Sequence, residues 1–293
     1  MKLIIFYGLL LIFIVLYYFC TTFCYMKRKL LIVILLPILA VSCGKYEKLL
    51  KSSDYALKYV KAFEYYENEE YVRAATIFEQ IATIYRGTVK ADTVQFYRAK
   101  SYFYQKDYIM AGHYFSELAQ TFPNSPFAEE SAFLDGFCEY KQSPRPSLDQ
   151  DNSFKAISKL SLFNIRYPES DKKEEAVNLI FELEEKLVQK SFMGAKLYFD
   201  LSLYNSSIIA LRNSLNQYPE TQFREELMFM ILKSYYLLAV NSVEEKKLDR
   251  FQAAVDEYYS YIGEFPKGPF SSEAEKIYET SMKMLGENYN VDN

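Results

Sequence analysis

An internal repeat constrains the fold of this chain more than any other feature. Residues 71–86 (YVRAATIFEQIATIYR) align without gaps with residues 108–123, 153–168, 204–219 and 251–266. Every segment carries a small residue, a large apolar or aromatic residue four positions later, and an aromatic residue eleven positions after the small one. In chain order, the three sets are Ala74, Ala111, Ala156, Ser207 and Ala254; Phe78, Phe115, Leu160, Leu211 and Tyr258; and Tyr85, Phe122, Tyr167, Tyr218 and Phe265.

This spacing is typical of an α-helix that presents one face to a neighbour. Positions i, i+4 and i+11 lie on the same side of a helix, and a small residue there lets a partner helix approach closely. Proline follows the aromatic residue in four of the five segments. Because proline cannot continue a helix, we predict five helices that end at these aromatic residues, each the second of a helical pair.

The first helix of each pair is visible upstream. Its small residue is expected at Ala62, Ala99, Gly136, Ala195 and Ser234. In the fourth pair this helix extends backwards, from Lys172 through Leu201. The whole pattern resembles the tetratricopeptide repeat, from Ser53 to about Leu285. The resemblance implies an all-α fold, an α-solenoid of five tetratricopeptide-like helix pairs with a concave groove.

The N-terminal region predicts an anchor. Met26–Lys29 is positively charged, and Leu30–Val41 is apolar but too short to span a bilayer. Small residues then lead to Cys43, which resembles the lipidated cysteine of a bacterial lipobox, although Ala40 stands where leucine is commonest. We expect Cys43 to carry acyl chains such as palmitate and to be the mature N-terminus. The alternative is an ordinary secretory signal followed by a chance cysteine.

Residues 1–25 hold a second apolar run. The simpler interpretation is a start codon assigned too early, with translation beginning at Met26, and the alternative is a genuine signal anchor. The expected organisation is therefore residues 1–25 as this extra segment, 26–42 as the lipoprotein signal peptide, 43–52 as a lipidated linker, 53–170 as repeats 1–3, and 171–293 as repeats 4–5 with the long joining helix.

Charge and cysteine content exclude some classes of function. Residues 1–42 hold four of the 34 basic residues and none of the 38 acidic ones, so the mature chain carries a net charge near −8. A nucleic-acid-binding protein usually has a basic face, so no nucleic-acid partner is expected. Only Cys43 and Cys138 remain in the mature chain. With Cys43 lipidated, no intramolecular disulfide can form, and Cys138 is expected to be a buried small hydrophobe.

No catalytic arrangement can be assembled from the sequence. His113 is the single histidine, so no zinc spacing and no Ser–His–Asp or Cys–His pattern is supported. Neither of two glycine-rich phosphate-binding motifs, GxxxxGK(S/T) and GxGxxG, occurs in the sequence. We therefore predict a binding scaffold rather than an enzyme, with no cofactor or metal other than the covalent lipid on Cys43.

The lipobox, the short spacer and the five repeats together resemble the BamD family, lipoproteins of the outer-membrane β-barrel assembly machinery. The endings Leu118–Ser125 and Tyr167–Ser170 are similar to that family's repeat junctions. The resemblance implies a lipid-anchored protein on the periplasmic face of the outer membrane. It also implies binding of a BamA-like barrel subunit through the C-terminal repeats, and of the C-terminal segments of unfolded outer-membrane proteins.

Two other functions stay open. One is a different periplasmic tetratricopeptide adaptor, of the Tol–Pal or envelope-division type. The other is a glycan-binding lipoprotein whose aromatic groove stacks sugars, against which the absence of tryptophan counts.

The tetratricopeptide resemblance also implies which side chains line the groove. At set offsets from Ala62, Ala99 and Gly136, the candidates are Tyr59, Phe63, Tyr66, Phe96, Lys100, Phe103, Tyr104, Phe133, Phe137, Tyr140 and Lys141. Rings and lysines suit an extended peptide with aromatic side chains and a terminal carboxylate. The alternative is that most of these rings pack between neighbouring helices.

Overall fold

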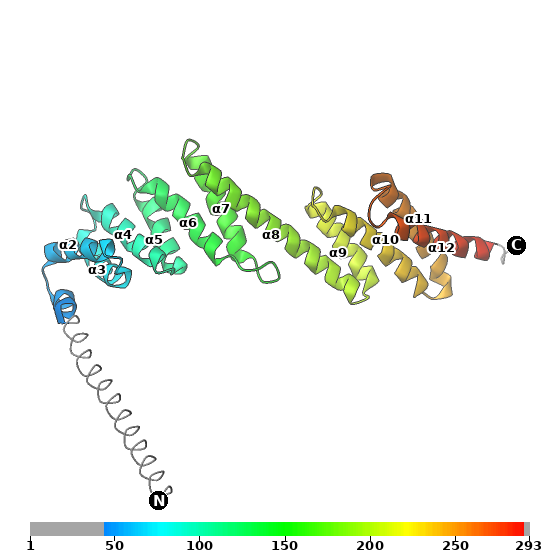
Figure 1. Ribbon diagram of the computed structural model, residues 1–293, viewed down its shortest axis with the longest axis horizontal. Coiled ribbons are helices and arrows are strands. Elements are labelled where there is room, and N and C mark those ends of the chain that lie inside the picture. Colours follow the sequence, from blue (N-terminus) through cyan, green and yellow to red (C-terminus); the bar gives the residue numbers. More distant parts are fainter. Residues whose placement is uncertain (1–43, 290–293) are drawn as a thin grey trace, which may run out of the picture. The chain divides into compact units, whose positions relative to one another are not determined.

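The computed structural model describes residues 44–289, and all regular structure within that range is helical (Figure 1). The helices are α2 Tyr55–Glu67, α3 Tyr71–Tyr85, α4 Ala91–Tyr104, α5 Tyr108–Thr121, α6 Ala128–Gln142, α7 Asp151–Arg166, α8 Lys173–Asp200, α9 Tyr204–Gln217, α10 Arg224–Val240, α11 Glu244–Glu264 and α12 Ser271–Tyr289. The predicted all-α class is confirmed. The predictions for residues 1–42 and for Cys43 lie outside the described residues.

The chain forms two compact units, one ending at Gln105 and one beginning at Lys106. In the first, α2 packs on α3 and α3 on α4; in the second, each helix from α5 to α12 packs on the next. The predicted boundary between residues 170 and 171 lies inside the second unit. The second unit continues through that point because α7 and α9 both pack on the long helix α8.

Helix α8 matches the expected extended helix and links two parts of the second unit. Its first half is tied to the preceding helices, since the Tyr140 hydroxyl donates to Glu182 at 2.6 Å and Lys186 donates to Ser143 at 2.6 Å. Its second half is tied to the following helices, for example by a 2.9 Å hydrogen bond from Ser191 to Ser214. One continuous helix therefore joins repeats three and four without a flexible loop (Figure 1).

The small residues of the repeat lie where helices meet. All five second-helix positions are buried, and so are the five first-helix positions. Ser207 of α9 and Ser234 of α10 show how close the backbones come, because their hydroxyl oxygens are 3.1 Å apart. Larger side chains at these positions would separate the helices. The predicted role of the small residues is therefore confirmed.

The helices end as the prolines require. Phe122, Tyr167, Tyr218 and Phe265 share one backbone conformation, with φ between −133° and −124° and ψ between 61° and 73°. The ring of a following proline disfavours the helical conformation in the residue before it. At the first junction, which lacks proline, Arg86 has ψ of 129° and Gly87 has a positive φ of 79°.

A hydroxyl residue completes four of these junctions. The hydroxyl residue lies three positions after the aromatic residue. Its side-chain oxygen accepts a hydrogen bond of 3.1 to 3.2 Å from the backbone N–H of the residue two positions further along the chain. The four residues are Thr88, Ser125, Ser170 and Thr221. Such local turns fix the direction in which the next helix starts. This explains physically why small polar residues follow the prolines.

Within the expected linker at residues 43–52, residues 44–51 are helical and pack on the rest of the first unit. Leu49 is buried in the cluster that includes Ala62 and Phe78, and the Tyr46 ring meets the Tyr65 ring edge-on at 5.6 Å. Lys58 donates to the carbonyl of Leu50 at 2.9 Å, which holds the end of this helix. The free energy gained by burying Tyr46 and Leu49 outweighs the conformational entropy that a flexible linker would keep.

We predict that Gly136→Ala destabilises the protein. A Cβ at this position would lie 2.8 Å from the Leu160 side chain and 3.2 Å from the Leu160 backbone nitrogen. Such overpacking costs about 1–3 kcal/mol, of which the better helix propensity of alanine offsets about 1 kcal/mol. Urea unfolding followed by circular dichroism measures the change.

Gly194→Ala is the matched control, because Gly194 also lies inside a helix and a Cβ there meets nothing within 4 Å. It is expected to raise the unfolding free energy by about 0.5–1 kcal/mol. Equal stability of the two variants would contradict the close approach at Gly136.

Candidate functional site

Three tyrosines of the first unit form an aromatic surface, called here the tyrosine cluster: Tyr66, Tyr71 and Tyr104. The Tyr71 and Tyr104 rings stack with centroids 4.8 Å apart, and Tyr66 lies 5.6 Å from Tyr71 and 6.1 Å from Tyr104. Burial, and then the neighbouring Tyr104, raise the pKa of Tyr66. Tyr104 keeps 45% of its surface exposed, so the cluster presents a ring to solvent.

Lysines stand beside two aromatic rings of the first unit, Tyr104 of the cluster and Tyr59 outside it. The Lys100 amine lies 5.4 Å from the centre of the Tyr104 ring, and the Lys90 amine lies 4.3 Å from the centre of the Tyr59 ring. An ammonium group near a ring face is attracted to the partial negative charge that the ring's quadrupole places on that face. The first unit therefore places the exposed Tyr104 ring and the half-buried Tyr59 and Tyr66 near positive charge, and their role as a binding site stays a prediction.

Other candidates in the list contribute mainly to packing. Phe63 lies 5.1 Å from the fully buried Phe78 and 4.8 Å from Tyr97. Phe96 and Phe133 are only 4% and 3% exposed, so they have almost no surface to offer an incoming peptide. For these three, the alternative of packing between helices describes the structure. Phe103 is half-buried, with its ring 5.8 Å from that of Tyr104.

The remaining candidates lie on α6 in the second unit. Phe137 lies 5.9 Å from Tyr140, and the amine of the exposed Lys141 stands 4.7 Å from the Phe137 ring centre. The hydrogen bond that Tyr140 donates to Glu182 raises the pKa of the phenol, so this hydroxyl stays protonated at neutral pH. The candidates thus form one set on the first unit and another on the second.

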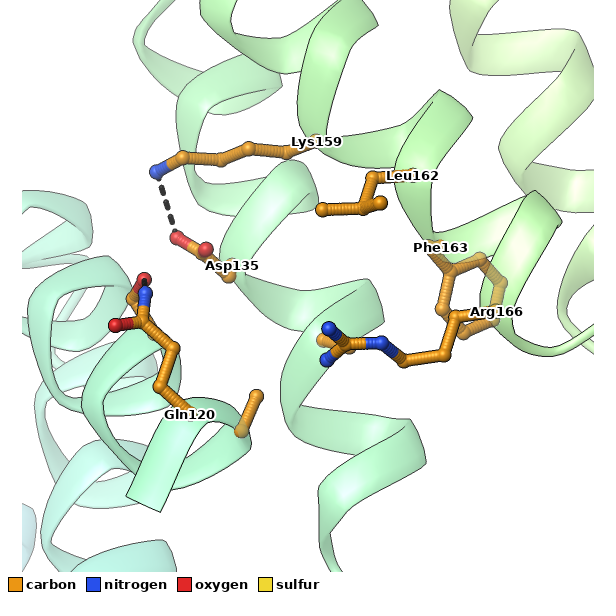
Figure 2. Close-up of a pocket in the computed structure, with 9 residues that line it drawn as sticks. Gln120, Asp135, Lys159, Leu162, Phe163 and Arg166 are labelled. Atoms are coloured by element: carbon orange, nitrogen blue, oxygen red, sulfur yellow. Dashed lines mark hydrogen bonds and ion pairs between the residues drawn. The ribbon is translucent and has the colours of Figure 1, made fainter. Parts of the chain in front are cut away.

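A small pocket between α5, α6 and α7 contains a charged cluster (Figure 2). Its volume is about 90 Å³. Lys159 reaches from α7 to Asp135 of α6 and donates to that carboxylate and to Glu139, both at 2.7 Å. Burial raises the pKa of Asp135, and the bond from Lys159 opposes that shift. Because these charges are satisfied by one another, we interpret the cluster as a link between helices.

The described residues offer little for metal or thiol chemistry. Cys138 is a fully buried free thiol whose pKa is raised to about 12 by burial, which confirms the expectation of a small core residue. His113 is exposed beside Tyr114. Within residues 44–289, no three histidine, cysteine or acidic side chains gather where they could hold a metal ion. In the same range no helix has the length and apolar character needed to cross a membrane.

Sequence reasoning missed one feature, an apolar pocket of about 480 Å³ between α7, α8 and the turn after α9. Phe154 and Phe181 line it and are 57% and 62% exposed. The signal that could have revealed it is that both phenylalanines lie outside the buried repeat positions. Phe154 lies two positions before Ala156, on a face that the repeat pattern leaves to solvent.

Comparison with known proteins places these observations in context. The model of the YfiO family, described as outer membrane lipoprotein, matches residues 52–251. A protein of Aquifex aeolicus (strain VF5), named putative outer membrane protein assembly factor BamD, is 25% identical over 260 residues, which is 88% of this chain and 83% of that protein. The solved TPR2AB-domain:pHSP90-complex of yeast Sti1 is 12% identical, with 78% of this chain and 99% of that chain covered and a TM-score of 0.35.

Proposed function

The chain belongs to the YfiO family of outer membrane lipoproteins, and on that premise we propose that it is a lipid-anchored scaffold of the machinery that assembles β-barrel proteins in the outer membrane. The family match from residue 52 to residue 251 is the observation that carries this proposal. The relative named as an assembly factor supports it. Neither comparison favours a Tol–Pal or envelope-division adaptor or a glycan-binding lipoprotein.

The anchor in this proposal is lipid on Cys43, with the protein on the periplasmic face of the membrane. Residues 44–51 bear on its geometry, because this helix packs on the first unit through Tyr46 and Leu49. A lipid on the preceding residue would therefore hold the first unit close to the bilayer, without a long flexible spacer. No cofactor or catalytic step belongs to the proposal, and the covalent lipid is the only non-protein group.

The main partner in this proposal is a BamA-like barrel subunit, bound through the C-terminal repeats from about Lys172 to Leu285. These repeats are suited to a firm platform because ion pairs join α9 to α11, α10 to α12 and α10 to α11. The Arg212 guanidinium lies 2.6 Å from Glu257, and Lys233 lies 2.7 Å from Glu273. Arg224 forms a further pair with Glu264. Each exposed pair contributes little to stability, but together they restrain the relative positions of α9, α10, α11 and α12.

Affinity purification from detergent-solubilised membranes tests this partner. We expect the full-length protein to recover a large β-barrel protein with several periplasmic domains. A chain that ends at Ser170 should lose that partner while its helical circular dichroism signal per residue is kept. The truncation uncovers the face of α7 that packs on α8, so monomeric behaviour in gel filtration is the necessary control. Undiminished recovery of the barrel protein by the shortened chain would contradict the assignment.

The clients in this proposal are the C-terminal segments of unfolded outer-membrane proteins. A barrel strand alternates apolar and polar side chains, and a chain end adds a carboxylate. The exposed Tyr104 and Lys141 suit both properties, together with candidates that keep part of their surface in solvent: Tyr59, Tyr66 and Lys100 on the first unit, and Phe137 and Tyr140 on the second. Phe63, Phe96, Phe103 and Phe133 would act behind them, as packing that holds the surface rings.

We predict that Tyr104→Ala and Lys100→Ala each weaken the binding of a peptide that ends in phenylalanine. An aromatic pair contributes about 0.5–1.5 kcal/mol, and 1.4 kcal/mol is about tenfold in Kd, so a loss of up to about tenfold is expected. Fluorescence anisotropy measures the Kd, and the melting temperature should hardly change. Lys51→Ala, which removes an exposed lysine of the same unit, is the control. Unchanged binding by both test variants would remove the first unit from the client site.

A further inference from the structure

The apolar pocket between α7, α8 and the turn after α9 is not used by the proposed function. Its apolar lining is formed mainly by Phe154, Ile157, Phe181, Leu187, Val188 and Tyr218. The volume of about 480 Å³ is in the range of sites that bind a few large side chains or a small molecule. We call it the α7–α8 pocket.

Two phenylalanines give the α7–α8 pocket its exposed character. Phe154 and Phe181 keep 57% and 62% of their surface in contact with solvent, whereas Phe163 of the same helix pair is fully buried. Exposing apolar surface to water is unfavourable, and a contiguous exposed patch on a folded protein marks an interaction site. Both rings line one hollow, so a single occupant can cover them together.

The rim of the pocket is acidic. Glu184, Glu185 and Glu220 line it, and no lysine or arginine is among the described residues that do. Glu184 and Glu220 are exposed, while Glu185 accepts a 3.1 Å hydrogen bond from Gln222. An apolar floor with carboxylates at its edge selects an apolar segment that carries positive charge at its ends.

We propose that the α7–α8 pocket binds a peptide segment of another protein in which large apolar residues are flanked by lysine or arginine. A second copy of this chain is a poorer occupant, because the mature chain carries a net charge near −8 and like charges oppose association. The lysine-bearing client surfaces at Lys100 and Lys141 have the opposite charge. The pocket is therefore a separate site and does not depend on the proposed client binding.

The test uses the full mature protein in detergent and a labelled peptide, blocked at both ends, of the order Lys-Arg-Leu-Phe-Ala-Leu-Lys-Arg. Fluorescence anisotropy measures its Kd, and a second peptide with glutamate in place of each basic residue is the charge control. We expect the basic peptide to bind at least about tenfold more tightly than the acidic one. Binding should weaken as the salt concentration rises, because the carboxylates are exposed.

Variants locate the peptide. Phe181→Ala and Phe154→Ala are each expected to raise its Kd about tenfold, with little change in melting temperature, because these rings are mostly in solvent. Glu184→Gln combined with Glu220→Gln should remove most of the salt dependence. The matched control is Ile165→Ala, which removes a 77% exposed apolar side chain of the same helix, α7, outside the pocket.

Three results would overturn the proposal. The first is equal affinity for the basic and acidic peptides, and the second is an unchanged Kd in the double variant Phe154→Ala, Phe181→Ala. The third is a concentration-dependent dimer, seen by analytical ultracentrifugation, that the same double variant abolishes, because the occupant would then be a second copy.

Discussion

Replacement of Cys43 by alanine is expected to abolish the attachment of the protein to the membrane by lipid. Each buried methylene of an acyl chain contributes about 0.8 kcal/mol. Several long chains therefore hold the protein firmly on the membrane, and without the cysteine there is no chain to hold it. The helix at residues 44–51 packs on the first unit. It therefore provides no second apolar anchor. Fractionation of cell envelopes, followed by mass spectrometry of the N-terminal peptide, measures the effect.

Cys138→Ala is the control for the anchor. Because that thiol is fully buried in α6, the substitution is expected to leave membrane attachment unchanged. An uncleaved precursor of the Cys43 variant would also sediment with membranes. The mass of its N-terminal peptide therefore distinguishes a precursor that keeps its signal peptide from a cleaved chain that is attached without lipid. A wild-type N-terminal peptide without lipid, together with membrane attachment that survives Cys43→Ala, would show that the lipoprotein assignment is wrong.

Phe78→Ala is expected to lower the free energy of unfolding by about 3–5 kcal/mol, as large-to-small substitutions of buried rings do. The Phe78 ring is fully buried, 5.1 Å from Phe63 and 6.2 Å from Tyr97. Its removal leaves a cavity among rings that cannot close over it. Urea unfolding followed by circular dichroism is the measurement. Tyr104→Ala, at a 45% exposed position, is expected to cost less than about 1 kcal/mol.

The comparison of these two variants separates packing from binding. If Tyr104→Ala weakens peptide binding without early unfolding, the tyrosine cluster acts as a binding surface. If Tyr104→Ala destabilises the protein as much as Phe78→Ala does, the ring belongs to the core. The packing of Tyr104 on Tyr71 would then be its main role, and the first-unit client surface would have to be abandoned.

Much of the fold could be predicted from the sequence because the responsible interactions are short-ranged. A small residue at Ala74 and its equivalents permits close helix contact whatever the surroundings are. Proline after Phe122, Tyr167, Tyr218 and Phe265 ends each helix through its own ring. Such local effects repeat wherever the motif repeats. They therefore predicted the helices, their ends and the long α8, and the family resemblance drawn from them is confirmed by the match at residues 52–251.

The candidate site could be predicted only in part. The offsets that selected Tyr104 and Lys100 also selected Phe96 and Phe133, which are buried. An aromatic residue on the first helix of a repeat can turn to solvent or fill the space beneath the next helix, and the sequence is the same in both cases. Residues 44–51 show the same problem, since a short segment with several charged residues packs on the core through Tyr46, Leu49 and Leu50.

The sequence by itself thus determined the helical repeat, the places where helices end and the motif around Cys43. Only the tertiary structure decided which rings are covered, where the two compact units divide, and that Phe154, Phe181 and three glutamates share one pocket. The physical reason is that helix formation and helix ends depend on residues within a few positions of one another. The exposure of a side chain depends instead on the elements that pack beside it, which can lie far away in the sequence, as with Phe181 and Tyr218.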